Sequence, residues 1–95
     1  MSKYLITYDL VGTDETSKDY ERLIEKIKAL GPPWGNLQKS VWVVKTSKSA
    51  SAIRDDLATV MDSNDRLFVV SLGSAGAWRN AICKDDFLKE FLESV

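Results

Sequence analysis

Short apolar runs alternate with polar and glycine-containing segments along the 95-residue chain. The first run covers residues 3–10 and is rich in β-branched and aromatic side chains. In a strand, alternate side chains point to opposite faces, so Tyr4, Ile6 and Tyr8 share one face and Asp9 lies on the other. Both faces are largely apolar until Asp9. This pattern predicts a central strand that ends in a carboxylate.

The later runs predict a helix at 20–30, strands at 34–38 and 40–45, a helix from residue 50, a strand at 66–72 and a helix from residue 85. Apolar residues recur at helical spacing in the helical segments, Val60 and Met61 included in the second. Gly31-Pro32-Pro33 is expected to end the first helix. One long bent strand over 34–45 is the alternative to two strands and a bend.

This order of elements predicts an α+β fold, the ferredoxin-like βαββαβ sandwich with an extra C-terminal helix. We expect one domain over 1–95, with a core at 3–73 and a C-terminal extension at 74–95. The first and fourth strands, both strongly apolar, are expected in the middle of the sheet. Two helices cover one sheet face, so the terminal helix or a second copy of the chain must cover the other. Symmetry favours a homodimer.

The amino-acid composition excludes several kinds of catalytic and metal site. The chain has no His and a single Cys83, so histidine-dependent catalysis, an intramolecular disulfide and cysteine-based metal sites are excluded. No apolar run is long enough to span a membrane, and we expect a cytoplasmic protein without a membrane partner. The net charge of −1 gives no global attraction to phosphate, so nucleic-acid binding requires a local basic patch or a metal.

Candidate chemistry starts at Asp9, where a rigid strand holds a carboxylate at the rim of the sheet. The alternative is that Asp9 only begins a turn. Four basic residues lie around the third strand and second helix, and with Trp34 and Trp42 they suggest a patch for nucleic acid: Lys39, Lys45, Lys48 and Arg54. A solvated face over core tryptophans is the competing interpretation.

Three stretches carry a resemblance to a known family: Tyr8-Asp9-Leu10, residues 37–42 and residues 65–73. Their order and spacing resemble the CRISPR-associated protein two family, the small partner of the CRISPR spacer integrase, over about residues 3–73. The hallmark positions of that family are Tyr8, Asp9, Gln38, Ser40, Val41 and Trp42 in this sequence. The wider superfamily includes the virulence-associated protein D toxins, which are ribonucleases.

The resemblance implies a homodimer in which the two copies of Asp9 face each other and hold a divalent cation such as Mg²⁺. Asp9 would be the metal ligand and, with Ser40, the catalytic residue of an endonuclease acting on RNA or DNA. Ser40 would orient water or phosphate, or would only hydrogen-bond a bend in the chain. Tyr8, Lys39, Lys45 and Arg54 are the residues expected to contact nucleic acid.

A non-catalytic dimer is the second hypothesis, a regulator that binds nucleic acid or protein and keeps only the fold. The acidic segment at 14–19, where DNA-binding members of the family carry arginines, favours it. Residues 84–95 predict a helix where the family commonly ends with a strand that pairs with the neighbouring subunit, so partnership with the integrase through that tail is not supported. The intact Tyr8-Asp9 pair and the Gln38-x-Ser40 motif favour the enzyme.

Overall fold

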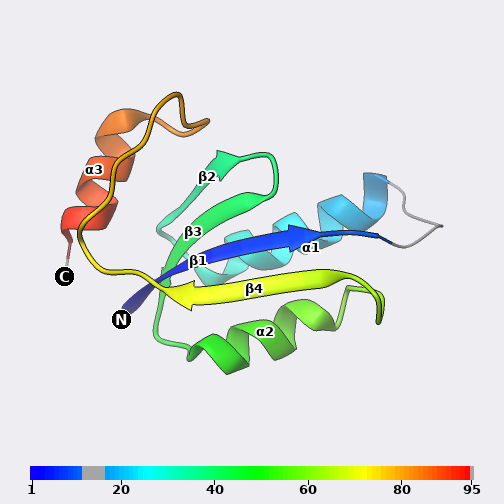
Figure 1. Ribbon diagram of the computed structural model, residues 1–95. Helices are drawn as coiled ribbons and strands as arrows, with labels where there is room; N and C mark the ends of the chain where they lie inside the picture. Colours follow the sequence, from blue (N-terminus) through cyan, green and yellow to red (C-terminus); the bar gives the residue numbers. More distant parts are fainter. Residues whose placement is uncertain (12–16, 95) are drawn as a thin grey trace.

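The computed structural model describes residues 1–11 and 17–94, so residues 14–16 of the acidic segment at 14–19 lie outside the described residues. The elements occur in the expected order and combine α-helices with an antiparallel sheet, which confirms the α+β class (Figure 1). They are β1 (Ser2–Asp9), α1 (Ser17–Leu30), β2 (Trp34–Gln38), β3 (Val41–Thr46), α2 (Ala50–Ala58), β4 (Arg66–Ser71) and α3 (Asp85–Glu93). No helix in the described ranges is long and apolar enough to cross a bilayer.

The four strands form one sheet in the order β2-β3-β1-β4, and each neighbouring pair is antiparallel. β1 lies between β3 and β4, with Ile6 paired to Trp42 on one side and to Val69 on the other. The 34–45 segment forms two strands, with an irregular register between Asn36 and Gln38. The two-strand interpretation is therefore confirmed, and the central position of β1 is as expected.

The main core lies between the sheet and the pair α1 and α2. Side chains from alternate positions of β1 and β3 meet apolar side chains of the two helices there, because both element types present one apolar face. The buried members are Tyr4, Ile6, Tyr8, Leu23, Ile27, Trp42, Val44, Ile53 and Leu57. The opposite face of β1 consequently carries Leu5, Thr7 and Asp9.

Local sequence signals explain where the helices on this face begin and end. α1 ends at Leu30, directly before the Gly31-Pro32-Pro33 stop that the sequence predicts. α2 begins after Ser49, whose Oγ accepts a hydrogen bond from the Ala52 N–H at 3.1 Å, a typical N-cap. α2 ends at Ala58, so the expectation that Val60 and Met61 belong to it is wrong, although both pack against the core.

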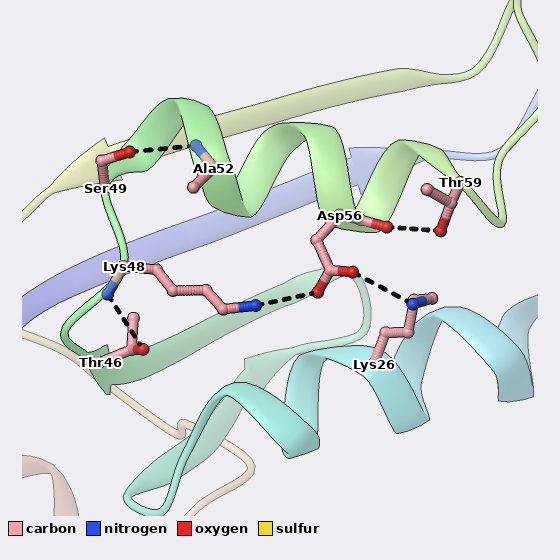
Figure 2. Close-up of polar contacts among 7 residues, drawn as sticks. All are labelled: Lys26, Thr46, Lys48, Ser49, Ala52, Asp56 and Thr59. Carbon is pink, nitrogen blue, oxygen red and sulfur yellow. Dashed lines mark hydrogen bonds and ion pairs between the residues drawn. The ribbon is translucent and has the colours of Figure 1, made fainter.

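An ion-pair network around Asp56 joins α2 to α1 and to the β3–α2 connection (Figure 2). Lys26 Nζ of α1 lies 3.2 Å from Asp56 Oδ1, and Lys48 Nζ lies 3.6 Å from Oδ2. The hydrogen bond from Lys26 lowers the pKa of the Asp56 carboxyl, against a smaller opposing effect of burial. The network thus fixes how α2 sits beside α1 at the surface of the core.

α3 covers part of the opposite sheet face, at the end where β1 begins (Figure 1). Leu88 and Phe91 are buried against Val43 of β3. Lys3 Nζ donates to the carbonyl oxygens of Leu92 and of Ser94, the latter at 2.8 Å. A cation at a helix C-terminus interacts favourably with unpaired carbonyls and the helix dipole. The terminal helix therefore covers this half of the face within one chain.

The last part of the connection from β4 to α3 lies along the free edge of β2. The backbone N–H groups of Ile82 and Cys83 donate to the carbonyls of Leu37 and Asn36, at 3.0 and 2.9 Å. Trp78 Nε1 donates to Asp85 Oδ1 at 3.1 Å and so ties this connection to the start of α3. These contacts pair part of an edge strand that would otherwise be open to other chains.

The fourth strand departs from the sequence expectation. β4 is an edge strand, so its predicted place in the middle of the sheet is wrong and β3 takes that place. Phe68 is 59% exposed and Val70 is 36% exposed. The run at 66–72 is apolar on both faces, although only one face is buried. Leu67 and Val69 pack on the core, whereas Phe68 and Val70 face the uncovered half of the sheet.

Candidate functional site at the end of β1

The candidate site is built on Asp9, the last residue of β1. Tyr8 before it points into the core between sheet and helices, so the alternation of the strand directs Asp9 to the opposite face. Asp9 is exposed there, at the arrowhead end of β1 and away from α3 (Figure 1). The strand pairs with β4 up to Asp9 and with β3 up to Thr7, so the carboxylate stands on a rigid support.

A hollow of about 150 Å³ lies beside Asp9, between the ends of β1 and β4. Thr7, Asp9, Arg66 and Phe68 contribute to its lining. Asp9 is the register partner of Arg66, and Thr7 is the partner of Phe68. Within the described part of the chain, neither the Asp9 carboxylate nor the Arg66 guanidinium makes a hydrogen bond or an ion pair. An anion and a cation are thus presented side by side, each open to a ligand.

The backbone of Ser40 lies beside this end of β1. Its carbonyl accepts a hydrogen bond from the Tyr8 N–H at 3.2 Å, in the bend just before β3. Ser40 is half-buried and is not among the described residues that line the hollow. The backbone contact agrees with its alternative role in the bend, while a role for its hydroxyl stays a prediction.

Tyr8 is a core residue, 3% exposed. Its hydroxyl accepts a hydrogen bond from Trp42 Nε1 at 3.3 Å. Burial raises the pKa of the Tyr8 phenol above its usual value, because the charged phenolate loses its hydration inside the protein. Contact between the Tyr8 ring and nucleic acid, expected from the sequence, would require this core to open.

The Tyr8 phenol predicts a loss of stability in alkali. A raised folded-state pKa favours folding below the unfolded-state pKa, which is about 10, and this contribution disappears as the pH rises above it. We expect the free energy of unfolding of the wild type to fall more steeply above about pH 10 than that of Tyr8→Phe. Urea titrations of both proteins on either side of that pH measure the difference. Parallel pH profiles would contradict the prediction.

The basic residues expected to bind nucleic acid are not gathered in one patch. Lys39 is exposed in the β2–β3 turn, whereas Lys45 lies near the other end of β3, roughly 15–20 Å away along an extended strand. Lys45 Nζ donates to Ser94 Oγ at 3.2 Å, and Arg54 on α2 pairs with Asp55 at 3.0 Å. The structure therefore brings none of the three into the hollow beside Asp9.

The tryptophans next to these residues form a separate cluster. The rings of Trp34 and Trp42 lie 5.7 Å apart, and Lys28 Nζ stands 4.7 Å from the centre of the Trp34 ring. Trp42 is buried and Trp34 is partly exposed. A cation over an aromatic face is a stabilising contact. The exposed ring of Trp34 is thus already occupied by Lys28, in agreement with a packing role.

Asp9 suits one particular kind of metal site. In residues 1–11 and 17–94, no three His, Cys, Asp or Glu side chains gather as a metal-binding group. Mg²⁺ commonly uses only one or two carboxylates and completes its shell with water and substrate phosphate oxygens. An exposed carboxylate on a rigid strand, with space beside it, fits that requirement.

No protein-family model matches the chain. Sequence reasoning found Asp9 but missed Arg66, although one signal was available: if the fourth strand pairs antiparallel with the first, the residue that starts one lies beside the residue that ends the other. Together, an open carboxylate and an open guanidinium can bind a cation and a phosphate next to each other.

Proposed function

We propose that the chain is a homodimeric nucleic-acid-binding protein, similar to the CRISPR-associated protein two family, that hydrolyses phosphodiesters with a divalent cation. The observation that carries the proposal is the open carboxylate of Asp9, exposed at the end of a central strand beside a hollow. The carboxylate has no partner among the described residues, so it is available to a ligand.

The ferredoxin-like assignment belongs to this proposal. The antiparallel order β2-β3-β1-β4 and the common face of α1 and α2 support it. The chain order β1-α1-β2-β3-α2-β4 consists of two strand–helix–strand units in succession, in agreement with the βαββαβ pattern. On this fold the Asp9 side chain, at the end of β1, lies on the sheet face that α1 and α2 leave open.

The homodimer is supported by the uncovered half of the sheet. Phe68 and Val70 of β4 are exposed on the same face as Asp9, beyond the part that α3 covers. Neighbouring exposed apolar side chains commonly mark an association surface. A second copy related by a two-fold axis would bury both residues and bring its own Asp9 toward the first.

The residues of the site fit Mg²⁺, with Asp9 from each copy as the ligands that the proposal names. If Asp9 holds Mg²⁺, the ion would supply Lewis-acid chemistry to a phosphodiester and to water, which is a route to hydrolysis that needs no histidine. Asp9 supplies the negative charge that binds the cation, and its strand fixes where that charge lies. Ser40, beside the end of β1, is proposed to position water or phosphate.

The non-catalytic dimer is the second candidate, and specific observations favour it. Tyr8 is buried, and Lys45 and Arg54 are engaged with Ser94 and Asp55. Phosphate affinity depends mainly on available Lys and Arg charges, so these contacts reduce what the chain offers to nucleic acid. A regulator that binds protein would not need free Lys and Arg side chains for phosphate.

Removal of metal tests the proposal. We expect the wild type to cleave labelled single-stranded RNA or double-stranded DNA with Mg²⁺ or Mn²⁺, to stop in excess EDTA, and to resume when metal is restored. Light scattering establishes the dimer in the same samples. Binding of nucleic acid without cleavage would favour the non-catalytic candidate. Absence of both binding and cleavage, or cleavage that survives EDTA, would contradict the proposed function.

A further inference from the structure

Arg66 is the cation nearest in register to Asp9. It begins β4, and the antiparallel pairing of β4 with β1 sets it directly opposite Asp9. The Cβ atoms of directly opposite residues in such a pair lie about 4.5–5.5 Å apart, on the same face of the sheet. Both side chains line the same hollow.

The two opposite charges do not form an ion pair with each other. Every ion pair among the described residues involves other groups, and the Arg66 guanidinium makes no hydrogen bond with them either. Arg66 is exposed, so its guanidinium is hydrated and free to exchange water for a ligand. A guanidinium in this position has its five N–H donors available.

A phosphodiester substrate needs a cationic side chain beside Asp9. The chain carries a net charge of −1, and Asp9 itself repels phosphate. Arginine offers a planar fork that matches two phosphate oxygens, so one side chain both attracts and orients the group. Lys39, Lys45 and Arg54 lie outside the hollow and cannot supply this contact there.

We propose that Arg66 is the phosphate-binding residue of the Asp9 site, where it holds the non-bridging oxygens of the phosphodiester beside the Asp9 carboxylate. The inference rests on the proposed function, because it names the group that brings the nucleic acid to Asp9. Thr7 and Phe68 border the same hollow and limit where the phosphate can enter. The sugar–phosphate backbone then lies across the ends of β1 and β4.

The test measures binding of a short fluorescein-labelled single-stranded RNA in EDTA, by anisotropy, over a series of salt concentrations. We expect Arg66→Gln to bind about tenfold more weakly. The slope of log binding constant against log salt should fall in magnitude by about one, as expected when one phosphate contact is lost. Arg66→Lys keeps the charge and should restore the slope, with only part of the affinity, because lysine lacks the fork.

Arg79→Gln is the matched control. Arg79 is an exposed arginine in the β4–α3 connection, away from the hollow, and its removal changes the total charge equally. We expect it to leave the salt slope near the wild-type value. Thermal unfolding of each variant checks the fold, and Arg66→Lys provides a second variant if Arg66→Gln is unstable.

Three outcomes would overturn the inference. The first is an unchanged affinity and slope in Arg66→Gln. The second is an equal loss in Arg79→Gln, which would indicate a general charge effect. The third is a double-mutant cycle with Asp9→Asn in which the two residues stabilise the fold through each other, since Arg66 would then be an ion-pair partner. If the wild type binds no nucleic acid, the proposed function fails as well. If the wild type binds and Arg66→Gln binds equally tightly, only the inference about Arg66 fails and the proposed function stands.

Discussion

Replacement of Asp9 with Asn is expected to reduce metal-dependent cleavage by at least about 100-fold, because loss of the carboxylate weakens both cation binding and stabilisation of transition-state charge. Asn has nearly the same size and shape as Asp, so the change removes charge and little else. The Asp9 side chain is exposed, and its carboxylate makes no hydrogen bond with another described residue. The free energy of unfolding should therefore change by less than about 0.5 kcal/mol.

The measurement compares initial cleavage rates of wild type and Asp9→Asn at several Mg²⁺ concentrations, with the dimer verified by light scattering. Asp62→Asn is the control, because Asp62 is an exposed carboxylate in the α2–β4 turn, remote in the chain from Asp9 and outside the hollow. Full activity in Asp9→Asn would remove Asp9 from the reaction. An equal loss in Asp62→Asn would attribute the effect to net charge.

Much of the fold could be predicted because its signals are local. Gly31-Pro32-Pro33 stops α1, Ser49 caps α2, and strand alternation assigns Tyr8 and Asp9 to opposite faces. The place of β4 in the sheet could not be predicted in this way. A run such as Leu67-Phe68-Val69-Val70 has the same composition whether its outer face is covered by its own chain, by a second copy, or by neither.

The two charged residues of the candidate site also differ in how far the sequence predicts them. Asp9 could be found from the sequence because a charged residue that ends an apolar strand is a local signal. Arg66 could be found only by assuming that the fourth strand pairs antiparallel with the first, because pairing between strands distant in the chain is not encoded in local periodicity. The burial of Tyr8 beneath Trp42 depends on such a pairing too.

The docking of α3 gives the prediction with the largest expected effect on stability. Gly35 of β2 is buried, and a Cβ atom added there would overlap the ring of Phe87 at the start of α3. Phe87 packs with Phe91, which is buried against the sheet, so the ring cannot move without disturbing the helix. We expect Gly35→Ala to lower the free energy of unfolding by about 1–3 kcal/mol through overpacking. Urea denaturation measures the loss, and hydrogen exchange in α3 should become faster than in the core strands.

Gly73→Ala is the matched control for this substitution. Gly73 follows β4, and nothing lies within 4 Å of a Cβ atom added to it, so the same extra methyl group meets open space. Gly35→Ala combined with Phe87→Leu should recover part of the stability, because the smaller side chain leaves room for the new methyl group. Equal stability of the two alanine variants would mean that α3 does not depend on the contact between Gly35 and Phe87. Asp9 lies at the opposite end of β1 from α3, so cleavage by folded Gly35→Ala should remain near that of the wild type.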